Sequence, residues 1–187
     1  MPRIRRVFFA GATALAMSVM VLSASVSAAS AKQGTGSVNC QMTGSVVFTP
    51  ALTTTAAPVT IKVTGKLINC GGSGDGANVT GGRFFGTISS TAMSCNSGTY
   101  STSGTLKSSY IVKTGTPTLT PSTISFVSIQ IQAGTPPPIA AQITGAVTAG
   151  SFFTDGEFGN VVSNQGTACS AKWRFTGVPT VSTYSLG

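Results

Sequence analysis

The chain contains no histidine, and its 187 residues include only three carboxylate side chains and one tryptophan. Without histidine it lacks the usual general base, the Ser-His-acid triad, the Cys-His pair and the most common ligand of catalytic zinc. Charged residues make up 7% of the chain, against about 25% in an average globular protein. These shortages argue against an enzyme and a bound cofactor, and they favour a non-catalytic binding or structural protein.

Threonine, serine and glycine fill the surface positions that charged residues would usually occupy. Serine and threonine compete for backbone hydrogen bonds inside helices, and glycine loses more conformational freedom than any other residue when it is ordered. The composition is therefore poor for helices and suits strands and turns.

The first 31 residues predict a cleavable signal peptide. Three arginines within the first six residues form a basic head, an apolar run follows to about residue 26, and Ala29-Ser30-Ala31 closes it with small residues. Cleavage after Ala31 would leave residues 32–187 as a single domain. It would also remove three arginines and lower the formal net charge from +8 to +5.

Two other interpretations of this segment stay open. The run approaches the ~20 residues that span a bilayer, but its alanine and serine make it only mildly apolar, so we expect no stable membrane insertion after cleavage. The stretch Arg5-Arg6-Val7-Phe8-Phe9 resembles a twin-arginine export signal, although Ile4 stands where a polar residue is usual. We favour the ordinary secretory route, and both it and the twin-arginine route predict a secreted protein, extracellular or associated with the cell wall.

Apolar and polar residues alternate along much of the remaining chain, which predicts half-buried strands. We expect strands over 38–48, 59–67, 79–93, 99–113, 122–132, 139–149 and 169–176, after a flexible lead at 32–37 and with a turn at 71–76. Turn signals between short strands are typical of all-β domains. The sequence therefore predicts one all-β domain, a two-layer antiparallel sandwich of Ig-like or jelly-roll-like type.

The four cysteines of an exported chain imply two disulfides, and three pairings are possible. The apolar faces of the first expected hairpin match in one register: Met42 with Leu67, Val46 with Val63 and Phe48 with Ile61. This register places Cys40 one position from Cys70, and a bulge near Ile68 would turn Cys70 inward. The hairpin favours Cys40 with Cys70, which leaves Cys95 with Cys169. Without histidine or a Cys-x-x-Cys pair, zinc is not expected.

Two of the three carboxylates lie close together in Asp155-Gly156-Glu157-Phe158-Gly159-Asn160. One hypothesis makes Asp155 and Glu157 the carboxylate pair of a glycan-acting hydrolase. Another makes Asp155, Glu157 and Asn160 oxygen ligands for calcium. The interpretation we favour is a glycine-rich turn that carries its charges into solvent.

The segment Lys172-Trp173-Arg174-Phe175 combines aromatic and basic residues. As a strand it would place Trp173 on one face and Lys172 and Arg174 on the other. Its functional interpretation is a ligand-binding site, with a sugar-stacking tryptophan or a basic stripe that meets anionic polymers. Its structural interpretation, which we favour for Trp173, is a core residue beside the disulfide of Cys169.

Several segments resemble a group of small secreted β-rich proteins of actinobacteria that have no assigned activity. They are Cys40-Gln-Met-Thr-Gly-Ser-Val-Val-Phe-Thr-Pro50, Val63-Thr-Gly-Lys-Leu-Ile-Asn-Cys70, Ile143-Thr-Gly-Ala-Val-Thr-Ala-Gly-Ser-Phe152 and the cysteine at 169. The resemblance implies an exported sandwich and supplies no functional residues.

The leading functional hypothesis is a non-catalytic binding or structural protein of the cell surface, with cell-wall polymer or carbohydrate as its partner. Export argues against nucleic acid. The alternatives are the hydrolase that uses Asp155 and Glu157, and a pilin-like assembly subunit whose sandwich is completed by a partner's strand.

Overall fold

The protein is described from a computed structural model. The described residues are 31–132, 139–152, 156–165, 169–175 and 183–186, and for 139–140, 156–165, 175 and 183–186 the description covers the main chain alone. The predicted signal peptide lies outside the described residues except for Ala31.

The described chain consists mainly of antiparallel strands. In chain order they are β1 (Val38–Thr49), β2 (Ala57–Gly72), β3 (Val79–Met93), β4 (Gly98–Ser101), β5 (Ser103–Val112), β6 (Ser122–Gln132), β7 (Ile139–Ala149), β8 (Gly156–Gln165), β9 (Lys172–Phe175) and β10 (Thr183–Leu186), with a short 3-10 helix, η1 (Gly74–Asn78), after β2. The expected all-β, antiparallel fold class is confirmed.

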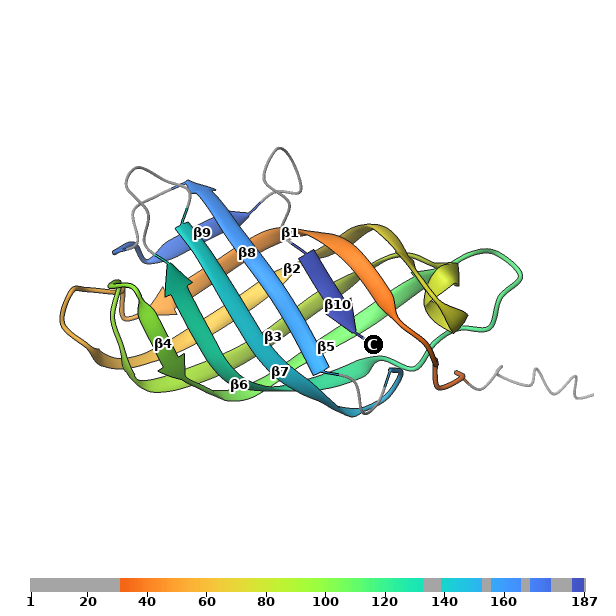
Figure 1. Ribbon diagram of the computed structural model, residues 1–187, viewed down its shortest axis with the longest axis horizontal. Helices are drawn as coiled ribbons and strands as arrows, with labels where there is room; N and C mark the ends of the chain where they lie inside the picture. The colour runs from red at the N-terminus through yellow and green to blue at the C-terminus, as the bar shows by residue number, and fades with distance from the viewer. Residues whose placement is uncertain (1–30, 133–138, 153–155, 166–168, 176–182, 187) are drawn as a thin grey trace, which may run out of the picture.

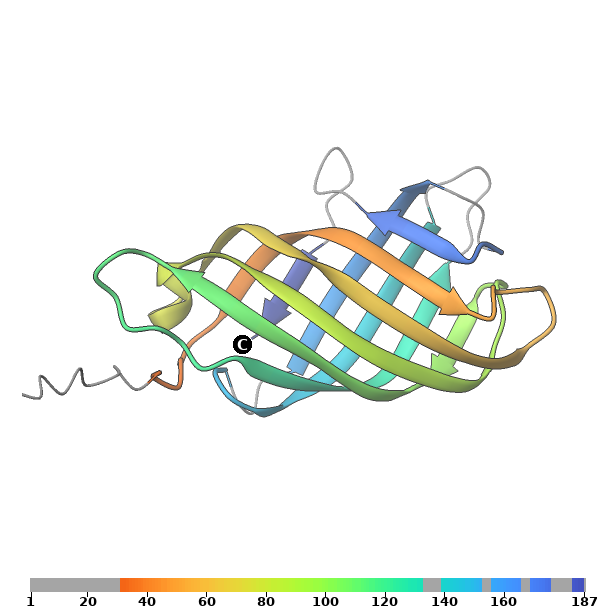
Figure 2. The same cartoon turned by 180° about the vertical axis from the view of Figure 1, so that it is seen from behind.

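All the strands belong to one sheet that closes on itself. Its order is β10-β1-β2-β3-β5-β6-β7-β8-β9, with β4 beside β6, and the additional pairings β10–β8 and β1–β9 join the two ends. Two walls face each other across the core: β6, β7 and β8 are nearest the viewer in Figure 1, and β1, β2, β3 and β5 in Figure 2. The two layers therefore belong to one continuous sheet, in which most consecutive strands pair directly because their connections are short.

Closure uses both edges of the first strand. β1 pairs with β2 on one side and with β9 and β10 on the other, and β8 likewise pairs with β7 and with both short strands. A pilin-like assembly needs an exposed sheet edge to which a partner strand can add. Within the described chain, β1 and β8 have strand partners on both sides and therefore offer no free edge to a partner strand.

The hairpin of β1 and β2 has the register that the sequence predicts. Met42 lies opposite Leu67, Val46 opposite Val63 and Phe48 opposite Ile61. The register shifts between Asn39 and Gln41, and Asn69 on the facing strand has a φ of 48°, as expected at a bulge. Cys40 is bonded to Cys70 across this irregularity, and Cys95 is bonded to Cys169. Both expected disulfide pairings are confirmed.

The core lies between the two walls and is made of inward-facing apolar residues. In β2, for example, Val59, Ile61 and Val63 are buried while Lys62 between them is exposed. The largest fully buried side chains are Trp173, Phe152, Ile61, Leu67, Ile88, Met93, Ile124, Ile131 and Val38. The period of two therefore sorts the residues of the long strands into core and surface.

The sequence-based prediction missed β8 and β10. The residues Glu157–Asn160, interpreted as part of a turn, lie in β8, where β7 on one side and β10 on the other supply ladder hydrogen bonds. Neighbouring strands thus override the weak strand propensity of glycine and asparagine. The expected strand over 99–113 is broken at Thr102, and the glycine-rich turn at 71–76 is divided between β2 and η1.

The lead at 32–37, expected to be flexible, is docked at one end of the sheet. The Lys32 amide donates to the Thr118 carbonyl at 2.8 Å, and the Lys32 carbonyl accepts from the Thr120 amide at 2.9 Å. The Lys32 ammonium forms an ion pair with Asp75 at 2.9 Å. Main-chain hydrogen bonds and a charge pair therefore order a segment whose sequence has no strand pattern.

Candidate functional site

Trp173 lies in the core of the closed sheet and is 2% exposed. Its ring meets Phe48 edge-on, with the ring centroids 4.6 Å apart, and its indole N–H has no hydrogen-bond partner among the described residues. A side chain buried in this way cannot stack on a sugar from solvent. The structure thus favours the packing role of Trp173, and its role in ligand binding stays a prediction.

The alternation that buries Trp173 turns its two basic neighbours outward. Lys172 and Arg174 are both exposed. In the pairing of β9 with β1, Lys172 lies opposite Val47 and Arg174 opposite Ser45. Both cations therefore belong to the outer surface of the wall that continues through β1 into β2.

More basic residues share this surface. Because buried and exposed residues alternate along β2, β3 and β5, the exposed residues of these strands face outward together with Lys172 and Arg174. The additional exposed cations are Lys62, Lys66, Arg83 and Lys107. We call the outward-facing residues of β9, β1, β2, β3 and β5 the basic wall; Figure 2 shows the strands that carry it.

The strand registers bring these cations close together. Lys66 of β2 lies directly opposite Arg83 of β3. Val47 separates Lys62 from Lys172, since it pairs with both. Adjacent strands are about 4.8 Å apart, so main-chain positions of neighbouring cations lie within roughly 5 to 10 Å. Residues far apart in the chain thus form one positively charged surface.

The pair formed by Lys66 and Arg83 is unfavourable for the fold alone. Like charges directly opposite each other in an antiparallel pair repel, and they destabilise the sheet. No acidic residue occurs in β1, β2, β3, β5 or β9 to offset them. The pair therefore leaves an uncompensated positive charge on this surface of the sheet.

Asp75 is the carboxylate whose side chain the structure describes, and it lies in η1 at the end of the wall. Its carboxylate accepts hydrogen bonds from the Thr35 amide and from the Lys32 ammonium, both at 2.9 Å. The Thr35 amide is the largest cause, followed by Lys32, of a pKa of Asp75 below its ordinary value of 3.8. Asp75 is therefore ionised near neutral pH, and it neutralises Lys32 rather than a cation of the basic wall.

A shallow groove crosses the basic wall beside the like-charge pair. Its lining consists of Thr43, Gly44, Ser45, Thr64, Gly65, Lys66 and Arg83. Gly44 and Gly65 lie directly opposite each other and contribute main chain to it. The hydroxyls of Ser45 and Thr64 are 3.5 Å apart. Two cations and several hydroxyl groups thus converge on one depression, where hydrogen-bond donors for an oxyanion are available.

Phe85 is the exposed aromatic residue among the described side chains of the basic wall. It follows Arg83 on the same face of β3, lies between Thr64 and Lys107 in the sheet, and is 56% exposed. Phe85 was not among the candidate site residues predicted from the sequence. The overlooked signal is the pair Phe84-Phe85 within a predicted strand, because two consecutive aromatics in a strand must face opposite ways.

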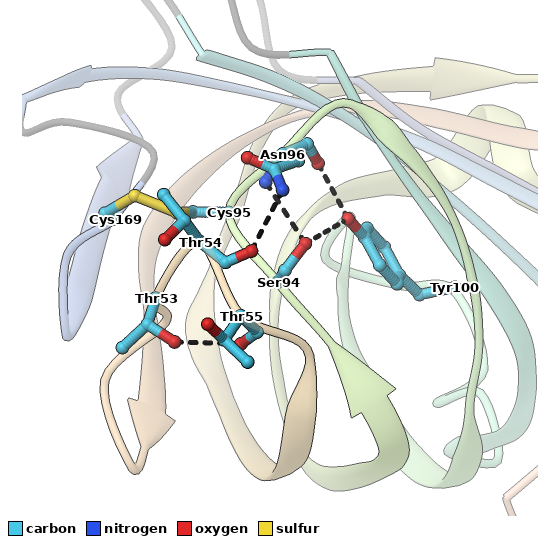
Figure 3. Close-up of a disulfide and its surroundings, with 8 residues drawn as sticks. All are labelled: Thr53, Thr54, Thr55, Ser94, Cys95, Asn96, Tyr100 and Cys169. Atoms are coloured by element: carbon cyan, nitrogen blue, oxygen red, sulfur yellow. Dashed lines mark hydrogen bonds between the residues drawn. A yellow bond between two sulfur atoms is a disulfide. The ribbon is translucent and has the colours of Figure 1, made fainter.

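The second disulfide anchors the strand that carries Lys172 and Arg174. Cys169, three residues before β9, is bonded to Cys95 in the turn after β3. In Figure 3 the Asn96 side-chain amide donates to the Thr54 carbonyl at 3.0 Å, and the Tyr100 hydroxyl donates to the Asn96 carbonyl at 2.8 Å. This network fixes the loop between β1 and β2 to the turn that holds the disulfide.

The acidic cluster considered from the sequence is only partly covered by the structure. Asp155 lies outside the described residues, and Glu157 and Asn160 lie in β8, where the main chain alone is described. The calcium site and the hydrolase site both stay predictions. Among side chains that the structure does describe, no three histidine, cysteine, aspartate or glutamate residues gather as metal ligands would.

No protein-family model, curated protein or solved structure matches the chain. The resemblance to secreted actinobacterial proteins stays a prediction. Within the described part of the chain, no helix has the length and apolarity that crossing a bilayer would require.

Proposed function

We propose that this protein is an exported, non-catalytic binding protein of the bacterial cell surface or extracellular space, and that its basic wall binds an anionic polymer there. The observation that carries the proposal is the gathering of exposed cations from β2, β3, β5 and β9 on one surface without an acidic residue in its strands. Charge of one sign concentrated on a surface attracts and orients a polyanion.

The covalent structure supports an extracellular place of action. All four cysteines are paired in the two disulfides, and such bonds form and persist in oxidising compartments. The predicted signal peptide supports the same compartment. An anionic polymer of the cell wall or extracellular matrix is then a more accessible partner than nucleic acid.

The non-catalytic part of the proposal rests on the sequence. The chain has no histidine to serve as a general base and only three carboxylates. Its cysteines are consumed in disulfides and do not supply a thiolate nucleophile. Binding through fixed charges needs none of these groups.

The test is a binding measurement with the purified protein on dextran sulfate, with neutral dextran as the uncharged comparison, over a range of salt concentrations. We expect binding to dextran sulfate alone, with an affinity that falls steeply as salt rises. In the variant that combines Lys62→Gln, Lys66→Gln and Arg83→Gln, the log–log salt slope should fall by about 2 to 3, because each lost contact removes somewhat less than one released counterion.

A matched control keeps the net charge change constant. Lys113 lies after the end of β5 and donates from its ammonium to the Ala77 carbonyl at 2.9 Å, outside the basic wall. Lys66→Gln should lower the slope by about 1 while Lys113→Gln leaves it unchanged. Equal slopes for these two variants, or undiminished binding by the triple variant, would overturn the proposal.

A further inference from the structure

The groove beside Lys66 and Arg83 and the exposed ring of Phe85 form two neighbouring and chemically different parts of the basic wall. Arg83 and Phe85 are two residues apart on one face of β3, which corresponds to about 7 Å along a strand. Lys66 faces Arg83, and Thr64 faces Phe85, so β2 flanks both parts. A ligand that lies along β3 would contact them in succession.

The groove has the chemistry of an oxyanion site. The planar guanidinium of Arg83 presents paired N–H donors that match the oxygens of a phosphate or sulfate, and Lys66 adds a point charge beside it. The hydroxyls of Ser45 and Thr64, 3.5 Å apart, can each donate to the same group. Among the described residues, the one carboxylate side chain, that of Asp75, is paired with Lys32, and no ion pair there involves Lys66 or Arg83.

The main chain under the groove is shaped by the core beneath it. A Cβ atom at Gly65 would collide with the ring of Phe84, which is 3% exposed and lies opposite Gly65 on the core side. The two adjacent phenylalanines of β3 therefore have different roles. Phe84 fixes the wall from inside, and Phe85 is left on the outer surface.

Phe85 has the chemistry of a platform for a sugar ring. Its face carries the negative part of the aromatic quadrupole, which attracts the partially positive C–H groups on the apolar face of a sugar. Exposure of 56% leaves the ring available. Nucleic acids usually stack on several successive aromatics, whereas Phe85 is the one exposed aromatic among the described side chains of the basic wall.

We infer that the basic wall recognises an acidic polysaccharide, with an oxyanion of the polymer in the groove between Lys66 and Arg83 and an adjacent sugar ring on Phe85. The inference rests on the proposed function and deepens it, because it names the class of polymer. The oxyanion can be a phosphate or a sulfate, since both present the same tetrahedral oxygens to the groove.

The test compares three probes on the purified protein: polyphosphate, which has anions and no sugar, and dextran phosphate and dextran sulfate, which have both. Phe85→Thr should weaken binding to both dextran derivatives about tenfold, by loss of stacking, and leave binding to polyphosphate unchanged. The combined Lys66→Gln and Arg83→Gln variant should weaken binding to all three. A difference between the two dextran derivatives identifies which oxyanion the groove prefers.

Val127→Thr is the matched control, because Val127 is 58% exposed on β6, outside the basic wall. It should bind all three probes like the unaltered protein. If Phe85→Thr binds the dextran derivatives as well as the control does, the sugar platform is wrong while the proposed function stands. If no probe binds, the proposed function itself fails. Tighter, Phe85-dependent binding of oligothymidylate would identify a nucleic acid and overturn the inference.

Discussion

The two walls of the closed sheet obey the same rule inside and differ outside. In β6 and β7, Ile129, Ile131 and Ile143 are buried, just as Ile61 and Val63 are in β2. The outward positions of β6 and β7 form what we call the neutral wall, because neither strand contains a charged residue. Packing therefore requires apolar residues on the inner surfaces of both walls. It does not require the outward-facing charges, which the basic wall has and the neutral wall lacks.

The interior of both walls should respond alike to a loss of volume, and this is the largest effect we expect. Trp173→Ala beneath the basic wall should lower the free energy of unfolding by about 3 to 5 kcal/mol, and Ile143→Ala beneath the neutral wall by about 2 to 5 kcal/mol. Urea unfolding measures both. A Trp173→Ala protein that keeps its stability and loses polymer binding would return Trp173 to the binding site.

Moving the charged pair from one wall to the other separates local charge from net charge. Gln130 and Gln142 lie directly opposite each other on the neutral wall, as Lys66 and Arg83 do on the basic wall. A variant with Gln130→Lys, Gln142→Lys, Lys66→Gln and Arg83→Gln keeps the net charge. We expect its affinity for dextran sulfate to fall at least about tenfold, since two contacts are removed from the groove. Undiminished affinity would mean that net charge alone drives binding.

The ion pair at the end of the sheet predicts a pH dependence outside both walls. Because the folded pKa of Asp75 is below 3.8, its contribution to stability is complete above that pH and is lost as the pH falls through 3.8 towards the folded value. Urea unfolding between neutral pH and pH 3 should show this loss, and Asp75→Asn should remove that part of the pH dependence. Polymer binding at neutral pH should be the same in both proteins.

The smallest expected effect concerns repulsion within the basic wall. Lys66→Thr should raise the free energy of unfolding by a few tenths of a kcal/mol at low salt, because it removes a like charge opposite Arg83. The gain should disappear at high salt, where surface charges are screened. Gln130→Thr on the neutral wall should show no such dependence on salt. Equal salt responses of the two variants would contradict the repulsion between Lys66 and Arg83.

The parts of the fold that the sequence predicted depend on local pattern. The alternation in β1 and β2 set their register, and the register brought Cys40 within reach of Cys70. The closing strands have no comparable pattern. Gly156 and Gly159 in β8 carry no side chain to mark a face, so their strand is defined by the neighbours with which it pairs, β7, β9 and β10.

The candidate site was harder to predict because its members meet only through pairing between distant strands. The sequence showed Lys172 and Arg174 as a possible basic stripe, but their nearness to Lys62 depends on the pairing of β9 with β1. Composition alone gave a net charge and could not show that these cations share one surface. Phe85 was overlooked because alternation shows only that Phe84 and Phe85 face opposite ways. Which of the two faces outward follows only when the buried face of β3 is known.

The way the sheet closes bears on the order in which its strands can pair as the chain folds. β1 appears early in the chain, yet the partners of its second edge are β9 and β10, near the other end. A chain that emerges from its N-terminus must therefore hold one edge of β1 unpaired until β9 and β10 have followed. A polypeptide cut before Thr183 would leave the edge at Val38–Gln41 without its partner, and an open edge of this kind pairs with other chains. The final strands thus cover the edge of β1 that would otherwise stay open to other chains.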